Sequence, residues 1–582
     1  MKFAPPTPRW GLPFATLLAC VGTACTNGGG AAEPQIPDPT EVAASFMEAL
    51  NDGDAAALAG LLDDESALVT ADLEKAIRKA PGRDVAGGYA VRLTQEPEAP
   101  SAEDGGDLST EAAYEIAYDV EQFDEVALEG SFEMVYEPEA EAWEVVEPDN
   151  LMFPGVKRGV RLDLEATWPK RGKILARNGV TIARGDGLSR TYSFGSFAGS
   201  TIGHLEPLTR KTVGAAAPGH EIGDLVGGSG LERAYEERLA GEPDLALRVV
   251  DRKRRPLLEL DDAEGKPAKN IRATLDMQVQ QATSNAFGST VGGAVVLDPR
   301  KGDVLAAVTS YEIDPNGYVG SAGVEPFNRA LAGTYPPGSA MKVMTAGAAL
   351  DAGVVQPSTR LTGPAEYQGV RNFESGAYPS LDFATAVRFS VNTAFAQVAL
   401  DLGARRLTRY AELFGFNAEP AMPLEAAESS FPFPEDAGDL MWGSIGQAQT
   451  LATPLQMASV AATVANGGKR MEPRSSLADP KEGARVLRRS TAHELSLLME
   501  NAVNGGTGTN ARISGVRIAG KTGTAEVDVG GKRRNHAWFI SFAPIDAPRV
   551  AIAVVSEYGG VGGQVAAPIA RDIYNGVLPL TR

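Results

Sequence analysis

Four apolar segments frame the C-terminal half of this 582-residue chain, and they constrain its fold more than any other feature. Gly293–Leu297 and Val304–Val308 begin that region, and Ala537–Phe542 and Val550–Val555 lie near its end. None of the four contains a charged residue, which is typical of strands that are buried on both faces. Ala-rich helical patterns lie between them. We therefore expect an antiparallel sheet flanked by helices, with strands drawn from both ends of the region.

Residues 42–150 have a different pattern. Apolar residues recur at helical spacing over 42–50, and Asp54 can cap a second helix. Apolar and other side chains then alternate over 114–120 and 126–134, which predicts two strands. Helices that are followed by an antiparallel sheet predict an α+β cone for this region.

Residues 151–270 are less regular and contain no motif that indicates a reaction. Asn178-Gly179 predicts a hairpin turn, because this pair favours the positive φ angles that such turns require. The basic run Arg252–Arg255 has two acids close behind it, Asp261 and Asp262, so we interpret the run as exposed surface rather than a ligand site. Together with the C-terminal region, these patterns predict a multidomain α+β protein.

The amino terminus has the composition of an export signal. Lys2 and Arg9 supply positive charge, and the uncharged run Gly11–Ala24 suits a signal-peptide core. This run is shorter than the roughly 20 residues that a membrane-spanning helix needs. Small residues lead directly to Cys25, as in a bacterial lipobox, where the chain is cleaved before a cysteine that receives a lipid. We therefore predict a signal peptide over 1–25 and lipidation of Cys25.

Other interpretations of the amino terminus stay open. Leu17–Cys20 is a second candidate lipobox, and the apolar run could instead be a short uncleaved anchor or a simple secretion signal. Residues 26–41 lack apolar periodicity, which predicts a flexible tether. No later segment has an apolar run of membrane-spanning length. We expect the rest of the chain to be extracytoplasmic, attached to the outer face of the cell membrane.

Charge and histidine content argue against two classes of function. The net charge is −21 at pH 7, and a surface this negative repels phosphate backbones, so we expect no nucleic-acid partner. The histidines are far apart and lack the spacing of zinc ligands. They are His204, His220, His493 and His536. We therefore expect neither a metal site nor a cofactor.

The first of three short motifs is S-x-x-K, which begins at Ser339 and follows a Pro-Pro-Gly sequence. Residues 339–350 favour a helix, which places Ser339 in the first turn with Lys342 on the same face. The positive potential at a helix N-terminus favours a serine alkoxide and a neutral lysine. Ser339 is therefore the candidate nucleophile, and Lys342 is the candidate base.

Two further motifs follow in order. Ser390–Asn392 has the pattern S-x-N, which by itself is also common in turns and caps. Lys521–Thr524 has the sequence K-T-G-T and follows small apolar residues, which are typical of a strand that a substrate backbone can approach closely. The lysine supplies charge, and the threonine hydroxyls can hold a carboxylate. Gly515–Thr522 also matches the phosphate-loop pattern, but its interior residues alternate as in a strand, so we reject a phosphate site.

The order S-x-x-K, S-x-N, K-T-G is the set found in penicillin-binding proteins and class A β-lactamases. The chain resembles a class B penicillin-binding protein, a monofunctional peptidoglycan D,D-transpeptidase. Segments outside the motifs carry the same resemblance: Asn328–Ala330, Thr453–Gln456, Ala465–Gly468 and Ala537–Phe539. Arg171–Gly179 is similar to a segment of the family's pedestal domain, although it has Ala176 where the family usually has Asp.

The resemblance implies three domains. Residues 42–150 resemble the NTF2-like domain at the front of some family members, and residues 151–270 resemble the pedestal, or dimerisation, domain. Residues 271–582 resemble the transpeptidase domain, which has the fold of the serine β-lactamases. A lipobox combined with an NTF2-like domain is similar to the penicillin-binding lipoproteins of actinobacteria.

The resemblance also implies roles for the motif residues. Ser339 attacks the penultimate D-Ala carbonyl of a stem peptide that ends in D-Ala-D-Ala, and Lys342 accepts its proton. Ser390 relays a proton toward the leaving D-Ala, with Lys521 orienting it. The residues expected to bind substrate are Asn392, Thr522, Gly523 and Thr524.

Partners and alternatives follow from the same resemblance. An amine of a neighbouring stem peptide resolves the acyl-enzyme, and β-lactams acylate the same serine. No glycosyltransferase domain is recognisable, so we expect a separate glycosyltransferase partner. A β-lactamase is disfavoured, because Glu425 and Glu428 lack the E-x-x-L-N pattern associated with deacylation. A non-catalytic scaffold that binds peptidoglycan and a D,D-carboxypeptidase remain as alternatives.

Overall fold

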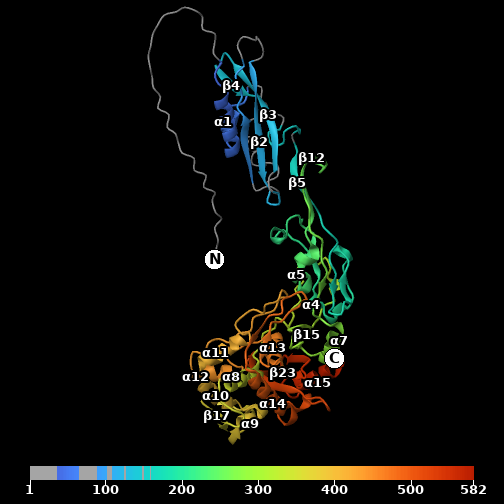
Figure 1. Cartoon of the computed structure of the whole chain (residues 1–582), viewed down its shortest axis with the longest axis vertical. Coiled ribbons are helices and arrows are strands. Elements are labelled where there is room, and N and C mark those ends of the chain that lie inside the picture. Colours follow the sequence, from blue (N-terminus) through green and yellow to red (C-terminus); the bar gives the residue numbers. More distant parts are fainter. Residues whose placement is uncertain are drawn as a thin grey trace, which may run out of the picture. The chain divides into compact units, whose positions relative to one another are not determined.

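The structure, a computed structural model, describes residues 36–63, 88–100, 108–123, 126–146, 150–157 and 159–581. The chain contains two compact units, one formed by residues 1–163 with 248–261 and the other by residues 164–247 with 262–582 (Figure 1). The predicted signal peptide, with Cys20 and Cys25, and most of the predicted tether lie outside the described residues. Among the residues that are described, no helix is both long enough and apolar enough to cross a membrane.

The described residues between 40 and 145 form two helices and a four-stranded antiparallel sheet. Helices α1 (Thr40–Asp52) and α2 (Ala55–Ala59) come before strands arranged in the order β1-β2-β3-β4. These strands are β1 (Gly88–Gln95), β2 (Ser109–Asp119), β3 (Val126–Glu137) and β4 (Ala142–Val145). The Asp54 side chain accepts hydrogen bonds from the N–H groups of Ala56 and Ala57, which confirms the predicted cap of the second helix.

This sheet buries one face against α1. On β2, Tyr114, Ile116 and Tyr118 are buried and alternate with more exposed residues, as the sequence pattern predicts. The rings of Phe46 on α1 and Phe132 on β3 pack with their centroids 5.2 Å apart. The predicted arrangement of helices followed by an antiparallel sheet is therefore confirmed.

Short strands and helices follow up to residue 272. They form sheets of order β12-β11-β5, β13-β6-β7-β8 and β10-β9. The predicted turn at Asn178–Gly179 connects β6 to β7, with Gly179 at a φ of +89°, and the basic run 252–255 is exposed, as predicted. The elements are β5 (Arg161–Thr167), β6 (Ile174–Leu175), β7 (Thr181–Arg184), β8 (Thr191–Tyr192), α4 (Gly199–Ile202), β9 (Leu205–Pro207), β10 (Leu225–Gly227), α5 (Gly230–Ala234), α6 (Glu236–Ala240), β11 (Asp244–Val250), β12 (Pro256–Ala263) and β13 (Ile271–Arg272).

A five-stranded antiparallel sheet organises the C-terminal region, which confirms the prediction from the four apolar segments. Its strand order is β15-β14-β24-β23-β22, so the two strands that begin the region pair with the three that end it. The strands are β14 (Gly292–Leu297), β15 (Val304–Thr309), β22 (Ala519–Val529), β23 (Lys532–Ala543) and β24 (Val550–Ser556). Strand β22 forms one edge of this sheet.

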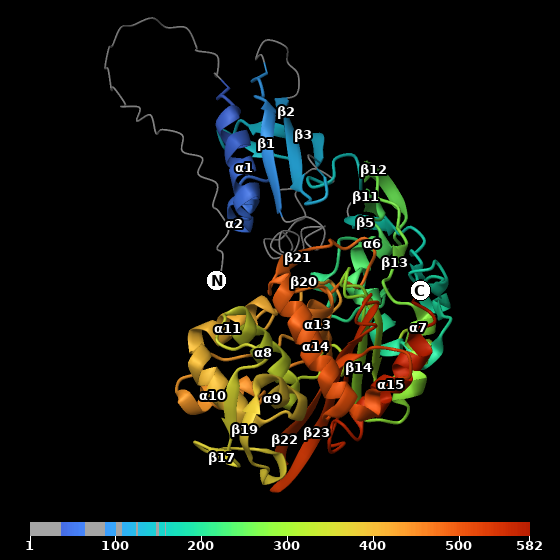
Figure 2. The ribbon, with the colours of Figure 1, turned by 60° about the horizontal axis from the view of Figure 1, so that its bottom comes forward.

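Both faces of the sheet are covered, which explains why β14, β15 and β24 are apolar without alternation. Val295 and Leu297 of β14 join one hydrophobic cluster with α8 (Lys342–Asp351) and α13 (Pro454–Ala465). The intervening Ala294 and Val296 join a second cluster with α7 (Met277–Phe287) and α15 (Ala566–Val577). Figure 2 shows α7 and α15 along one face of the sheet and α13 with α14 (Arg489–Gly505) along the other.

The remaining helices and strands belong to the region between β15 and β22. They are the helices α9 (Phe383–Phe389), α10 (Asn392–Leu402), α11 (Ala404–Leu413) and α12 (Ala437–Ser444), and the strands β16 (Arg360–Gly363), β17 (Glu366–Tyr367), β18 (Val370–Arg371), β19 (Tyr378–Asp382), β20 (Lys469–Met471) and β21 (Gly483–Arg485). Helices α9 and α10 are separated by Ser390 and Val391, so the S-x-N motif lies at the junction of two helices.

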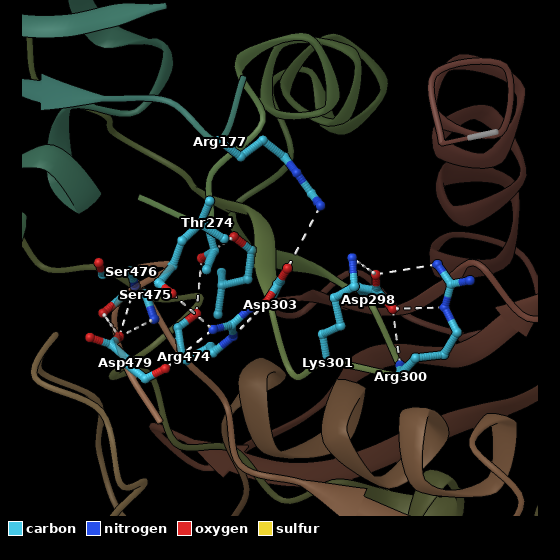
Figure 3. Close-up of polar contacts among 12 residues, drawn as sticks. Arg177, Thr274, Asp298, Arg300, Lys301, Asp303, Arg474, Ser475, Ser476 and Asp479 are labelled. Atoms are coloured by element: carbon cyan, nitrogen blue, oxygen red, sulfur yellow. Dashed lines mark hydrogen bonds and ion pairs between the residues drawn. The ribbon is translucent and has the colours of Figure 1, made fainter. Parts of the chain in front are cut away.

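A buried ion pair anchors the turn between β14 and β15 (Figure 3). The Asp303 carboxylate accepts a hydrogen bond of 2.6 Å from Arg474, and the two side chains are 1% and 3% exposed. Arg177 approaches the same carboxylate at 3.7 Å. On the other side of the turn, Arg300 pairs with Asp298 but is 58% exposed. Asp303 is therefore held by cations from segments far apart in the sequence.

Candidate active site

Ser339 lies in a short 3₁₀ turn, Gly338–Met341, that leads directly into α8. The sequence predicts one continuous helix from Ser339, whereas the α-helix itself begins at Lys342. Side chains three residues apart eclipse each other in a 3₁₀ helix, so the tighter turn keeps Ser339 and Lys342 on the same face. Ser339 is partly exposed, and its side chain forms no hydrogen bond with the described residues.

The Ser339 turn packs too closely against its neighbours for side chains to intervene. Gly338 has a φ of +53°, and a Cβ atom there would lie 2.7 Å from the Thr524 carbonyl oxygen. A Cβ atom at Gly523 would lie 2.6 Å from the Pro337 carbonyl oxygen, and one at Gly446 would lie 2.3 Å from that of Gly338. The turn is therefore clamped between β22 and the segment that contains Gly446.

Hydrogen bonds fix the approach to this turn. The buried Trp538 indole on β23 donates to the Pro336 carbonyl oxygen at 2.9 Å. Tyr335 exchanges backbone hydrogen bonds with Ala452, and its hydroxyl donates to the Glu557 carboxylate at 2.6 Å. These contacts hold the residues before Ser339 against the sheet.

Lys342 is 1% exposed, and its ammonium group points at the S-x-N motif. Its Nζ atom donates to the Ser390 carbonyl oxygen at 2.7 Å, to Ser390 Oγ at 3.2 Å and to Asn392 Oδ1. Burial and the neighbouring charge of Lys521 hold the pKa of Lys342 well below its usual value. This shift favours the neutral amine that a base requires.

Lys521 approaches the same serine from the opposite side. Its Nζ atom donates to Ser390 Oγ at 2.8 Å and to the Thr522 carbonyl oxygen at 3.0 Å, and the residue is 1% exposed. Burial lowers the pKa of Lys521 to about 7. Ser390 itself follows α9 with a φ of +60°, an unusual conformation for serine that directs its hydroxyl between the two lysines.

Asn392 is the first residue of α10. Its Oδ1 atom accepts the hydrogen bond from Lys342, and its Nδ2 atom donates to the Arg371 carbonyl oxygen on β18 at 2.7 Å. An amide nitrogen has two N–H groups, so one remains for a further acceptor. The structure thus brings the residues of the first two motifs and Lys521 into one hydrogen-bonded cluster.

The K-T-G-T motif presents two different faces along the edge strand β22. Lys521 and Gly523 pair with Ile540 and Trp538, which belong to the hydrophobic cluster on the α8 side. Successive strand residues point to opposite faces, so the two threonine side chains of the motif lie on the other face. The lysine and the threonines therefore reach the free edge of β22 from opposite sides.

The threonine side has its own contacts. Thr522 Oγ1 lies 2.6 Å from Thr507 Oγ1, and the Gly562 N–H group donates to Thr524 Oγ1 at 3.3 Å. Thr507 could not be predicted from the sequence, because a threonine in a Gly-rich segment has no periodicity or spacing that singles it out. In the part of the chain that the structure describes, no cluster of His, Cys, Asp and Glu could hold a metal ion.

Comparison with known proteins places this site in a family. Two family models match the chain, the penicillin-binding protein transpeptidase domain over residues 292–575 and the penicillin-binding protein dimerisation domain over residues 185–273. The peptidoglycan D,D-transpeptidase PbpA of Mycolicibacterium smegmatis is 37% identical over 393 residues, which cover 59% of this chain and 78% of that protein. The chain belongs to the class B penicillin-binding proteins. All three motifs of this penicillin-binding protein lie within the matched transpeptidase domain.

Other relatives support the same assignment. The peptidoglycan D,D-transpeptidase MrdA of Acinetobacter baumannii is 28% identical over 442 residues, which cover 67% of this chain and 66% of that protein. The ceftriaxone acyl-enzyme complex of penicillin-binding protein A from Mycobacterium tuberculosis matches with a TM-score of 0.57 and 30% identity, covering 70% of this chain and 98% of that one. Pseudomonas aeruginosa penicillin-binding protein 2 matches with a TM-score of 0.61 and 30% identity, covering 71% of this chain and 96% of that one.

Proposed function

We propose that this penicillin-binding protein is a peptidoglycan D,D-transpeptidase that forms an acyl-enzyme on Ser339 and is acylated at the same residue by β-lactams. The observation that carries the proposal is the pair of buried lysines that share the Ser390 hydroxyl beside the Ser339 turn. Neither buried lysine has a carboxylate partner among the described residues, so burial disfavours their charged forms, and such perturbed groups are typical of catalytic sites.

Acylation begins when Ser339 Oγ attacks the penultimate D-Ala carbonyl carbon and Lys342, as the neutral amine, takes the Ser339 proton. Lys342 passes this proton to Ser390, which lies 3.2 Å away, while Ser390 gives its own proton to the leaving D-Ala nitrogen. The peptide bond breaks, an ester to Ser339 forms, and Lys342 is neutral again. Lys521 orients the Ser390 hydroxyl for this transfer through its 2.8 Å hydrogen bond.

Substrate binding falls to the residues around this relay. The backbone N–H groups of Ser339 and Thr524 form the oxyanion hole, a kind of donor whose loss costs roughly 10²–10³ in rate. The remaining N–H group of Asn392 holds the substrate amide, and Thr522 and Thr524 hold the terminal carboxylate. Gly523 leaves room for the substrate backbone along the edge of β22.

The second half-reaction transfers the acyl group to an amine. The amine of a neighbouring stem peptide attacks the ester carbonyl, and its proton returns through Ser390 and Lys342 to Ser339 as the ester bond breaks. Water as the acceptor gives a D,D-carboxypeptidase instead.

A fluorescent penicillin tests the nucleophile. We expect durable labelling of the purified protein and loss of the label in Ser339→Ala. The control is Ser496→Ala, because the Ser496 hydroxyl donates only within its own helix, to the Ala492 carbonyl oxygen. Rapid release of the label indicates a β-lactamase, and a wild-type protein that is never labelled indicates a non-catalytic scaffold. Either result overturns the proposal.

Product analysis then distinguishes the transpeptidase from the carboxypeptidase. The protein is incubated with a D-Ala-D-Ala stem peptide and an amine acceptor, and the products are identified by mass spectrometry. A cross-linked peptide is expected, and release of D-Ala alone indicates hydrolysis. Loss of both products in Ser339→Ala assigns them to this site.

We also propose the cellular setting that the sequence predicts. The chain is a lipoprotein attached through Cys25 to the outer face of the bacterial cell membrane, residues 42–150 form an NTF2-like domain, residues 151–270 a pedestal and residues 271–582 the transpeptidase domain. A separate glycosyltransferase supplies the glycan strands. Metabolic labelling with an alkynyl fatty acid tests the anchor: Cys25→Ala is expected to lose the label and Cys20→Ala to keep it, and the reverse result assigns lipidation to Cys20.

A further inference from the structure

A Gly-rich loop outside the three motifs connects the segment of the S-x-N motif to the K-T-G-T motif. The bridging loop, residues 505–508, begins at the last residue of α14 and lies beside Arg388, two residues before Ser390. Arg388 Nε donates to the Gly505 carbonyl oxygen at 2.9 Å, and the Thr507 N–H group donates to the Arg388 carbonyl oxygen at 3.4 Å. One end of the bridging loop is thus tied to the segment that carries Ser390.

Two glycines of the bridging loop lie very close to Arg388. A Cβ atom at Gly505 would lie 2.3 Å from Arg388 Nη2, and one at Gly506 would lie 2.2 Å from the Arg388 carbonyl oxygen. Real Cβ atoms essentially never approach this closely. The first of these atoms is the end of a flexible side chain, whereas the second is backbone, so the loop can approach the Arg388 backbone this closely only because Gly506 lacks a side chain.

Thr507 connects the other end of the bridging loop to β22. Its Oγ1 atom lies 2.6 Å from Oγ1 of Thr522, which is 6% exposed, whereas Thr507 is exposed. Each hydroxyl has one proton, so the hydrogen bond between them uses one proton and leaves the other free. If Thr507 donates, the free proton belongs to Thr522 and is polarised by the bond that Thr522 accepts.

We propose that Thr507 is a positioning residue whose hydroxyl orients the Thr522 hydroxyl toward the C-terminal carboxylate of the acyl donor. This inference rests on the proposed function and deepens it. A carboxylate can only accept hydrogen bonds, so Thr522 must present its proton at the edge of β22. The hydrogen bond from Thr507 fixes the orientation of the Thr522 hydroxyl before the substrate arrives. The bridging loop holds Thr507 at a fixed position relative to the segment that carries Ser390.

The test compares a penicillin that has its free carboxylate with its neutral methyl ester. We measure the second-order rate constant for acylation by each probe, and the ratio of the two rate constants reports recognition of the carboxylate. In Thr507→Val, we expect the rate for the acid to fall about tenfold, as for the loss of one hydrogen bond to a charged group, with the rate for the ester nearly unchanged. Thr507→Ser keeps the hydroxyl and is expected to restore the wild-type ratio.

Thr509→Val is the matched control, because Thr509 lies two residues further along and its hydroxyl has no hydrogen bond with the described residues. Its ratio is expected to stay at the wild-type value. The inference is overturned if Thr507→Val slows both probes equally, which indicates a structural role only, or slows neither. A wild-type protein that neither probe acylates refutes the proposed function instead, so the two failures are distinguishable.

Discussion

Replacing Gly523 with alanine tests whether the Ser339 turn is positioned by direct contact with the edge strand. The new methyl group would lie 2.6 Å from the Pro337 carbonyl oxygen, 2.9 Å from Trp538 Cβ and 3.0 Å from the Ala340 nitrogen. The shortest of these falls about 0.8 Å below the 3.4 Å at which ordinary contact begins. Two of the three atoms are backbone atoms on either side of Ser339, so the clash is relieved by moving the nucleophile.

A displacement of this size predicts a large loss of rate with a moderate loss of stability. A misplacement of about 1 Å can cost roughly 10²-fold in rate, and overpacking typically costs about 1–3 kcal/mol. We therefore expect Gly523→Ala to lower the acylation rate with a fluorescent penicillin about 100-fold. Gly317→Ala is the control, because a Cβ atom at Gly317 meets nothing within 4 Å. An acylation rate within about threefold of wild type, in a protein of unchanged melting temperature, would refute the reasoning.

Three further predictions concern pH and stability. Burial and the neighbouring charge of Lys521 hold the pKa of the base, Lys342, well below its usual value, but acidification still protonates this amine. The acylation rate should therefore fall as the pH decreases, and a flat profile contradicts this. Trp538→Phe leaves a buried carbonyl oxygen without its donor and should cost about 1–3 kcal/mol in urea unfolding, whereas an unchanged midpoint contradicts the role of the indole. Arg474→Met leaves the Asp303 carboxylate buried without its closest cation and should lower the free energy of unfolding by about 3–5 kcal/mol. Arg300→Met, at an exposed pair, should lower it by less than about 1 kcal/mol. Equal effects of the two substitutions contradict the burial argument.

Much of the fold could be predicted because it depends on local patterns. Uncharged apolar runs predicted strands β14, β15, β23 and β24, since a strand covered on both faces excludes charge wherever it lies. Asp54 predicted the start of α2 because a cap acts on the next turn of the chain. The motif residues of the site could be predicted from their order in the chain. Their roles stay predictions until the acylation experiments are done.

What the sequence alone determined about this protein is which segments form strands and helices and which residue types the site contains. Only the tertiary structure decided their geometry: the left-handed backbone of Ser390, the lysines on either side of its hydroxyl, and the opposite faces of β22 that carry Lys521 and Thr522. Thr507 entered the site in the same way. The physical reason is that backbone propensity acts over a few residues, whereas the Ser390–Lys521 contact spans 131 residues and exists only once the sheet register and helix packing are fixed. The low pKa of a buried lysine likewise follows from what surrounds it, and no neighbour in the chain encodes that burial.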